Sequence, residues 1–227
     1  MTLRILYGGT FDPIHNGHLA VALHARDVLH AEVSLLPARD PPHKGPTSAA
    51  ADDRARMCEL AVAGLESIDV DARELHRDTP SWTIDTLREL RGEIGDRAPL
   101  ALLVGADSFL GLPTWKEWRE LPKFAHFVIA ERPGFDLDAA MSPELAAEFG
   151  PRFTASAQAL HGAPAGLAFR LRQPATPESA TELRRRIAAG EPWQDWVPPA
   201  VAGYIVRNCL YDPACMGPAA TPPPGHL

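Results

Sequence analysis

Short apolar runs alternate with amphipathic stretches along most of this 227-residue chain. Two of the runs, LALLV at residues 100–104 and HFVIA at residues 126–130, are apolar at nearly every position. Such runs are typical of strands in a sheet that helices cover on both faces. A regular succession of strand and helix favours parallel strands joined by helical crossovers. We therefore predict an α/β fold with a doubly wound, Rossmann-like parallel sheet.

The individual elements are predicted from the periodicity of each stretch. The predicted strands are residues 3–7, 33–37, 68–70, 100–104, 126–130 and 167–171. The predicted helices are residues 17–29, 51–64, 83–94, 144–149, 181–189 and 199–209. Prolines and glycines predict loops at residues 38–50 and 153–165.

The chain is long enough for one large domain with a sizeable core. We predict a single domain over residues 1–211, whose part from about residue 175 onward is helical. The Pro/Ala/Gly-rich residues 212–227 have little apolar surface to bury and are expected to be disordered.

The formal net charge of −7 narrows the range of partners. It argues against a general nucleic-acid binder and a basic membrane-surface protein, but it permits a small anionic ligand held by local cations. No apolar run approaches the roughly 18 residues of a membrane span, and no signal-peptide pattern is visible at the N-terminus. Cys58, Cys209 and Cys215 fit no metal-ligand spacing and are interpreted as reduced thiols. These features predict a cytoplasmic protein and carry no information on its oligomeric state.

The stretch GGTFDPIHNGHL, residues 8–19, directly follows the first predicted strand. A helix that begins there presents unpaired backbone N–H groups and the positive end of its dipole, which together form an anion site. Gly8 and Gly9 remove Cβ atoms where a phosphate would approach the backbone. His15 and His18 are three residues apart, so on the first helical turn they would share a face and donate hydrogen bonds to a phosphate.

Other interpretations of this stretch remain open at this point. It matches neither G-x-G-x-x-G nor G-x-x-x-x-G-K-[ST], the two common phosphate-binding fingerprints. The pair His15 and His18 is compatible with half of a zinc site, although no convincing set of further ligands accompanies it. Asn16 is a candidate cap for the helix, and Gly17 would lie in its first turn.

GGTFDPIHNGH matches the G-x-F-D-x-x-H-x-G-H form of the T/HxGH signature, and the chain therefore resembles the nucleotidylyltransferase superfamily. The superfamily transfers a nucleoside monophosphate from a nucleoside triphosphate to an acceptor phosphate and releases pyrophosphate. Members with different acceptors share the signature, so the rest of the chain has to distinguish among them.

Further stretches are similar to the bacterial nicotinate-mononucleotide adenylyltransferase family: PARDPPHK, SWTIDTLREL, GADSFLGLPTWKEW and SATELRRRI, with YIVRNCLY near the end. The resemblance covers about residues 3–211. Glu178 departs from the family, which usually has an apolar residue before the serine of its Ser-x-Thr-x-x-Arg motif. Trp82 stands where an aromatic residue, often tyrosine, is usual.

The resemblance implies transfer of AMP from ATP to nicotinate mononucleotide, which yields nicotinic acid adenine dinucleotide and pyrophosphate in NAD biosynthesis. The nucleophile is a phosphate oxygen that is mostly ionised at neutral pH, because the second pKa of a phosphate monoester is near ~6. No general base is then needed, and catalysis rests on alignment and on neutralising the charge that passes to pyrophosphate. Mg²⁺ is expected to arrive with ATP, held mainly by phosphates and water, because no dedicated carboxylate cluster is visible.

The resemblance also implies roles for individual residues around ATP. His18 is the leading candidate for stabilising the transition state, His15 lies on the phosphates beside it, and Arg184 clamps the outer phosphates. Lys44 and His43 are expected to reach the reacting phosphates from their loop. The implied ATP-binding residues are Gly8, Gly9, Thr10, Phe11, His15, His18, Asp107, Ser179, Thr181 and Arg184.

For the acceptor, the resemblance implies that Trp115 stacks on the pyridine ring, while Thr83 and backbone N–H groups near residues 115–116 receive the nicotinate carboxylate. Such donors favour a carboxylate over a carboxamide, whose NH₂ group offers them no acceptor. The implied nicotinate mononucleotide residues are His43, Lys44, Thr83, Trp115, Lys116 and Arg132.

Several of these residues also have a purely structural interpretation. Ser179, with Glu182 three residues later, fits a capping box, and Asp107 fits a cap of the helix that follows it. Arg184 belongs to a run of three arginines that would normally form a solvated face. Trp115 is also typical of a core residue.

Three other functions are compatible with parts of the pattern. The phosphopantetheine adenylyltransferase family shares the signature, but it is typically shorter and lacks SWTIDTL and LPTWKEW. The loss of His15, His18 or Arg184 would favour a non-catalytic nucleotide-binding protein on the same fold, and all three are present. A metal-dependent hydrolase would use the two histidines as ligands.

Overall fold

The computed structural model describes residues 1–39, 47–77, 81–173 and 176–213. Most of the predicted 38–50 loop, with His43 and Lys44, lies outside the described residues, as does the predicted disordered end from residue 214 onward. Within the described part, no helix is both long and apolar enough to cross a membrane. Cys58 is a buried free cysteine and Cys209 an exposed one, and Cys215 lies outside the described residues.

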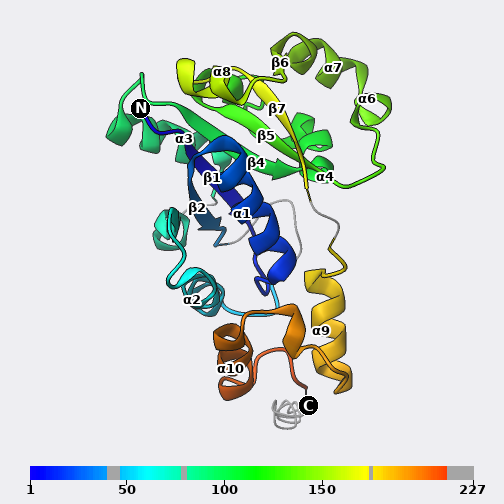
Figure 1. Ribbon diagram of the computed structural model, residues 1–227. Coiled ribbons are helices and arrows are strands. Elements are labelled where there is room, and N and C mark those ends of the chain that lie inside the picture. Colours follow the sequence, from blue (N-terminus) through cyan, green and yellow to red (C-terminus); the bar gives the residue numbers. More distant parts are fainter. Residues whose placement is uncertain (40–46, 78–80, 174–175, 214–227) are drawn as a thin grey trace, which may run out of the picture.

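Seven parallel strands form one sheet in the order β3-β2-β1-β4-β5-β7-β6, which confirms the predicted doubly wound arrangement (Figure 1). From β1 the chain builds outward through β2 and β3 and then returns to the other side of β1 with β4. The strands are β1 Arg4–Gly9, β2 Glu32–Pro37, β3 Ile68–Val70, β4 Leu100–Gly105, β5 His126–Glu131, β6 Phe153–Thr154 and β7 Ala168–Arg172.

The strand order reverses between β1 and β4, where open α/β sheets bind ligands outside the carboxyl ends of the strands. Tyr7 of β1 pairs with Leu35 of β2 on one side and with Leu103 of β4 on the other. Gly8 and Gly9 follow at the end of β1. We call this side of the sheet the carboxyl edge, and the side at which the strands begin the amino edge.

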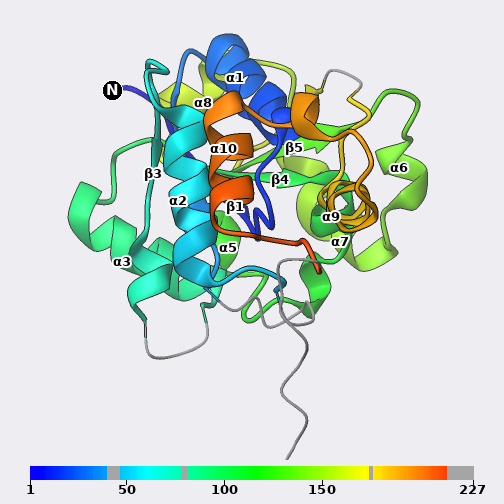
Figure 2. The same ribbon diagram turned by 90° about the horizontal axis from the view of Figure 1, so that it is seen from below.

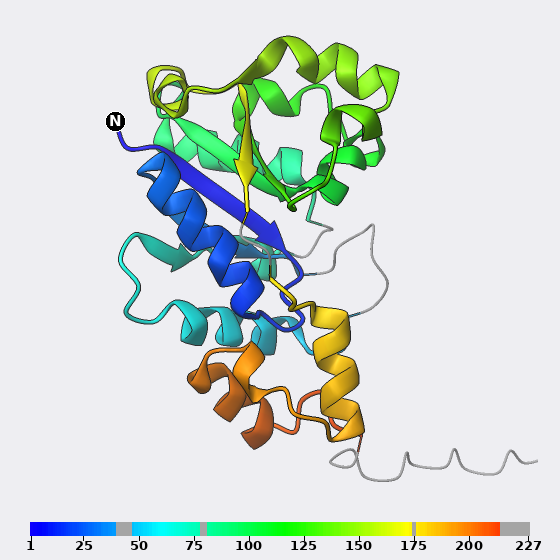
Figure 3. The same ribbon diagram turned by 45° about the vertical axis from the view of Figure 1, so that its right-hand side comes forward.

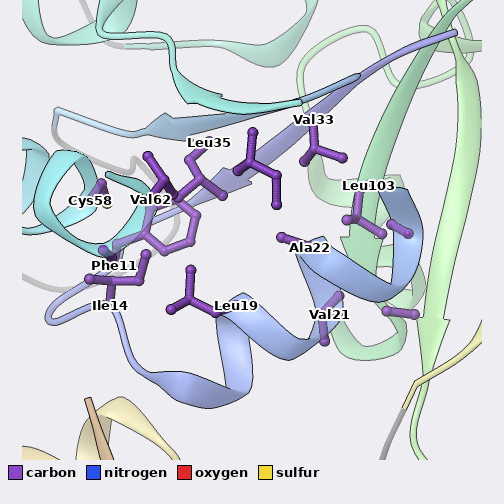
Figure 4. Close-up of a cluster of buried hydrophobic side chains, with 14 of the residues drawn as sticks. Phe11, Ile14, Leu19, Val21, Ala22, Val33, Leu35, Cys58, Val62 and Leu103 are labelled. Carbon is purple, nitrogen blue, oxygen red and sulfur yellow. The ribbon is translucent and has the colours of Figure 1, made fainter. Parts of the chain in front are cut away.

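Helices cover both faces of the sheet, because each buries an apolar stripe in one of two cores. In the first core, Phe11 and Ile14 from the loop after β1 lie beside Leu19 and Cys58 (Figure 4), so two buried side chains attach the loop to this core. The helices of the first core are α1 Asn16–Leu29, α2 Ala51–Val62, α8 Ala157–Gly162, α9 Ala180–Ala189 and α10 Pro199–Arg207. Those of the second are α3 Thr83–Ile94, α4 Ala106–Leu110, α5 Leu121–Phe124, α6 Leu137–Ala140 and α7 Pro143–Phe149. Short 3₁₀ turns occupy Arg73–His76, Leu112–Thr114, Gly150–Arg152 and Gln194–Trp196.

The last two helices extend the domain beyond the carboxyl edge. Helix α10 packs beside α2 (Figure 2), and the Tyr204 hydroxyl donates to the Asp53 carboxylate at 2.8 Å. Helix α9 stands below the sheet, with its first turn near the start of α1 (Figure 3). The region predicted as helical is therefore helical, with a turn between its two helices.

Residues 153–165, predicted as a loop, instead contain β6 and α8. Strand β6 has two residues and α8 has six, so neither is long enough to show a clear periodicity. Both depend on their surroundings: β6 pairs with β7, and Ser156 caps α8 by accepting from the Ala159 N–H at 3.3 Å. Helices α4, α5 and α6, of four or five residues each, were absent from the prediction for the same reason.

Candidate active site

The loop after β1 is held in a strained conformation. Phe11 has a φ of 48°, in the left-handed region that non-glycine residues avoid. Its ring is 1% exposed and packs edge-on against the rings of Tyr7 and His18, with centroid distances of 5.6 and 5.1 Å. A Cβ on Gly9 would lie 2.7 Å from the Phe11 ring, so only glycine fits there. Backbone strain of this kind clusters at functional sites, which makes the loop a candidate binding element.

Asp12 connects this loop to distant parts of the chain. Its buried carboxylate accepts hydrogen bonds from the N–H groups of Ser48 and Ala49, at 2.7 and 3.1 Å, and from the Tyr211 hydroxyl at 2.7 Å. Its main-chain carbonyl accepts from Nη1 of Arg184 at 2.5 Å. Burial and the Asp12 charge raise the pKa of Tyr211 far above its ordinary value, so its hydroxyl remains a donor. The signature motif contains Asp12, but the sequence carries no signal for partners so far along the chain.

His15 and His18 form a stacked pair at the start of α1, with ring centroids 3.7 Å apart. The His15 backbone N–H donates to His18 Nδ1 at 3.3 Å, so in the neutral ring Nε2 of His18 carries the proton. The cap of α1 is His15, in an extended conformation, and the prediction of Asn16 as the cap is wrong. Asn16 is instead the first helical residue, and its side-chain amide donates to the Asp195 carbonyl at 2.8 Å.

Burial decides the protonation state of His15. The residue is 6% exposed, and desolvation lowers its pKa to about 4, so the ring is neutral at pH 7. Its Nδ1 is buried and has no hydrogen-bond partner among the described residues. A buried polar atom without a partner is destabilising, and a ligand that supplied a partner would be bound more tightly for that reason.

A first cavity, of about 300 Å³, opens between the ends of β1 and β4 and the start of α3. Trp82 and Trp115 both line it, and Thr83 is the first residue of α3, where helical N–H groups lack intrahelical partners. Lys116 also lines the cavity, with its Nζ 2.9 Å from the Asp85 carboxylate. The lining also includes Gly8 and Gly9 at the end of β1 and Thr10 after it, three residues that the resemblance assigned to ATP.

Two details refine the predicted acceptor pocket. The Trp115 N–H donates to the Leu112 carbonyl at 2.8 Å, so one of the backbone N–H groups predicted near residues 115–116 is already paired within the protein. The start of α3, with Thr83, supplies further donors on that side of the cavity. Thr10 lines this cavity, and its hydroxyl is buried and has no hydrogen-bond partner among the described residues.

A second cavity, of about 330 Å³, lies across Gly105, which lines both cavities. Its lining combines His15 and His18 at the start of α1 with Ser179 at the start of α9. Two helix N-termini therefore face one space, and each contributes unpaired N–H groups and partial positive charge. This is the stronger anion site of the two cavities. No group of three or more His, Cys, Asp or Glu side chains within the described ranges is arranged to hold a metal ion.

The three arginines of α9 differ in their contacts. Arg185 and Arg186 pair with the Glu182 carboxylate at 2.8 and 3.0 Å, and these hydrogen bonds lower the pKa of Glu182 to about 2. Arg184 instead reaches the Asp12 carbonyl beside the loop after β1. Ser179 caps the helix by accepting from the Glu182 N–H at 3.2 Å, but the Glu182 carboxylate pairs with the two arginines, so only the serine half of the predicted capping box forms. It also lines the second cavity, so capping and ligand binding are compatible at Ser179.

The remaining residues predicted for the site differ in whether they line a cavity. Asp107 lines the second cavity from the first turn of α4, whose cap is Gly105, so Asp107 does not cap that helix. Arg132 is exposed and lines the second cavity, not the Trp115 cavity with which it was grouped. Thr181 is exposed and lines neither cavity. Glu178 lines the second cavity, and its buried Oε2 has no hydrogen-bond partner in the described part of the chain.

Arg54 is a site-adjacent residue that sequence reasoning missed. It is fully buried in α2 and binds the Thr10 carbonyl through Nη1 at 2.7 Å. A signal for it existed, because Arg54 shares one face of the predicted helix with Cys58 and Ala61, at i, i+4 and i+7. A charged residue in such an apolar stripe has to find polar partners inside the protein.

The chain is similar to known proteins over most of its length. A family model described as "Cytidylyltransferase-like" matches residues 6–186, which defines the class of the protein. A protein of Stenotrophomonas maltophilia named "Probable nicotinate-nucleotide adenylyltransferase" is 51% identical over 216 residues, 93% of this chain and 97% of the relative. A Xylella fastidiosa protein of the same name is 41% identical over 214 residues, 92% of this chain and 96% of the relative.

Solved structures show the same fold. The chain is similar to the Plasmodium falciparum nicotinic acid mononucleotide adenylyltransferase complexed with NaAD, with a TM-score of 0.71 at 17% identity. The match covers 93% of this chain and 98% of that one. With the relatives above, the chain belongs to the nicotinate-nucleotide adenylyltransferase family of nucleotidyltransferases.

Proposed function

We propose that this protein transfers AMP from ATP to nicotinate mononucleotide and forms nicotinic acid adenine dinucleotide and pyrophosphate. The observation that carries the proposal is the meeting of two different cavities at Gly105. One combines aromatic faces with a helix N-terminus, which suits a flat ring bearing a carboxylate. The other combines two helix N-termini with two imidazoles, which suits a polyphosphate. The names of the relatives support the same reaction.

In this reaction an oxygen of the acceptor phosphate forms a bond to the α-phosphorus of ATP, and the bond from that phosphorus to the β-phosphate oxygen breaks. Pyrophosphate leaves with the electron pair. The nucleophile is ionised, so no side chain has to remove a proton, and the protein contributes alignment and charge stabilisation. His18 donates from Nε2 to the phosphates, because its Nδ1 is held by the His15 N–H. Arg184 and the start of α9 add positive charge on the pyrophosphate side.

The pyridine ring of the acceptor stacks on Trp115, and its carboxylate faces the start of α3 near Thr83. The Thr10 hydroxyl, on a residue that lines the first cavity, would donate to a phosphate oxygen of the acceptor. We retain His43 and Lys44 as phosphate contacts on the family resemblance alone, because both lie outside the described residues.

Mg²⁺ is proposed to enter with ATP. The carboxylates of Asp107 and Glu178 line the second cavity, and the buried Glu178 Oε2 has no partner among the described residues. Carboxylate oxygens are ligands that Mg²⁺ accepts beside phosphate oxygens and water, so the side chains present fit such an ion. When bound, it neutralises charge on the phosphates.

Pyrophosphate release from ATP tests the proposal, with nicotinate mononucleotide, nicotinamide mononucleotide and phosphopantetheine as alternative acceptors. We expect strong preference for nicotinate mononucleotide and loss of activity in excess EDTA. Equal use of the amide would remove the role given to Thr83. Preference for phosphopantetheine would favour the rival transferase, and ATP binding without release in any mixture would favour a non-catalytic protein.

A further inference from the structure

Arg54 binds four main-chain carbonyls at the carboxyl edge of the sheet. Nη1 donates to Thr10 at 2.7 Å and to Ala38 at 2.6 Å, Nη2 donates to Arg39 at 2.6 Å, and Nε donates to Ala49 at 3.4 Å. The side chain is 0% exposed and lines neither cavity. Its planar guanidinium therefore links the ends of β1 and β2 to the start of α2 without lining either cavity.

The hydrogen bond from Arg54 to the Thr10 carbonyl determines the direction in which the Phe11 N–H points. The Thr10 carbonyl and the Phe11 N–H belong to one planar trans peptide group and point in opposite directions. A carbonyl held by Arg54 inside the protein thus turns the Phe11 N–H away from Arg54. No hydrogen bond from this N–H to another described residue is present. Phe11 is also the strained residue of the loop, at a φ of 48°, so an external hydrogen bond is needed to keep this peptide in place.

We propose that Arg54 is a positioning residue of the adenylyl-transfer reaction: its guanidinium orients the Thr10–Phe11 peptide so that the Phe11 N–H and the Thr10 hydroxyl face the substrate phosphates. Arg54 does not touch substrate and acts through the loop. The inference rests on the proposed function, because it takes the loop after β1 to be the phosphate-binding element.

Arg91 provides a matched control at the opposite edge. It is 6% exposed, lies on the buried face of α3, and also donates to four main-chain carbonyls. Those carbonyls are at the amino edge. Three of them precede a strand (Ala98 before β4, Phe124 before β5 and Pro164 before β7), and the fourth, Gly95, follows α3. The four distances are 2.6 to 3.1 Å. A change of Arg91 therefore removes the same kind of contact from the same kind of site, but away from both cavities.

The test compares Arg54→Lys with Arg91→Lys in the full chain. Lysine keeps the positive charge and the aliphatic part of the side chain but lacks the planar guanidinium, so both variants are expected to fold with similar losses in melting temperature. For Arg54→Lys we expect kcat to fall about 10- to 100-fold, the scale of a small misplacement near the reacting atoms. For Arg91→Lys we expect kcat within about twofold of the wild type, measured well below both melting temperatures.

An NMR spectrum of the backbone amides adds a measurement that would not change if Arg54 were only structural. ATP should shift the Phe11 N–H resonance in the wild type and in Arg91→Lys, and the shift should be lost or strongly reduced in Arg54→Lys. Equal kinetic losses in the two variants, an unchanged Phe11 response in Arg54→Lys, or failure of Arg54→Lys alone to fold would each overturn the inference. A wild type that did not use nicotinate mononucleotide would instead contradict the proposed function, before any variant was compared.

Discussion

The two edges of the sheet contain the same kinds of buried polar side chain but satisfy them differently. At the amino edge, His126 is fully buried, its Nδ1 accepts from the Leu167 N–H at 3.0 Å, and its Nε2 donates to the Ala163 carbonyl at 2.9 Å. At the carboxyl edge, His15 is almost as buried, yet its Nδ1 has no partner among the described residues. Burial lowers the pKa of both rings, so both are neutral at pH 7 and differ only in their partners.

The difference extends beyond the two histidines. The buried side-chain atoms without a hydrogen-bond partner, within the ranges that the structure describes, are Thr10 Oγ1, His15 Nδ1, Glu131 Oε1 and Glu178 Oε2. All of them end a strand or follow one, at the carboxyl edge. Each such atom costs about 1–3 kcal/mol of stability when left without a partner. Three of the four residues, Thr10, His15 and Glu178, also line one of the two cavities, which is why the carboxyl edge is the candidate site for a ligand.

The largest expected contrast between the edges is in turnover. Replacing His18 with alanine should lower kcat by roughly 10²-fold or more, because one preorganised donor to the reacting phosphates is lost, whereas ATP binding should weaken much less. His161→Ala is the control: that half-buried ring contacts the Leu29 carbonyl at 2.7 Å at the amino edge, and kcat should change less than about twofold. Steady-state kinetics and an ATP-binding titration measure both. Normal turnover in His18→Ala would mean that His18 is only structural.

A smaller contrast concerns titration. The pKa of His15 is about 4 in the folded chain and 6.5 in the unfolded one, so between these values the unfolded state binds more protons. Stability should therefore fall as the pH is lowered from 6.5 towards 4, and His15→Asn should flatten that decline. Bound ATP places anionic charge beside His15 and should raise its pKa, while the pKa of His126 stays unchanged. Imidazole NMR titrations check this, and equal behaviour of the two rings would remove the distinction between the edges.

The smallest contrast involves two helix caps of similar geometry. Ser179 Oγ and Ser142 Oγ each accept from an N–H three residues later, both at 3.2 Å, but only Ser179 lines a described cavity. Alanine at either position should cost about 1 kcal/mol of unfolding free energy, the typical value of a cap. Only Ser179→Ala should also raise the KM for ATP, by a few-fold. Denaturant unfolding and kinetics separate the two effects, and an unchanged KM would leave Ser179 with its capping role alone.

Much of the fold follows from local pattern. Helix α3 and strand β3 have the predicted bounds, and the other predicted helices and strands differ by one or a few residues at their ends. Periodicity is local, so long elements are visible in one sequence, whereas β6 and α8 are too short and depend on their neighbours. The site is similar: the contiguous motif identified the loop, His15 and His18, but the division of residues between two cavities was not visible. Arg132 lines the second cavity, and Gly8 and Gly9 line the first, a division that their positions in the chain do not suggest.

The sequence by itself determined the succession of the longer strands and helices, their parallel arrangement and the position of the loop proposed to bind phosphate, because each is encoded in consecutive residues. Only the tertiary structure decided which of two buried arginines lies beside the candidate site. Arg54 and Arg91 look alike in sequence, since each lies in the apolar stripe of an amphipathic helix. Their carbonyl partners come from segments up to 44 and 73 residues away, and only the folded backbone brings one set to the carboxyl edge and the other to the amino edge.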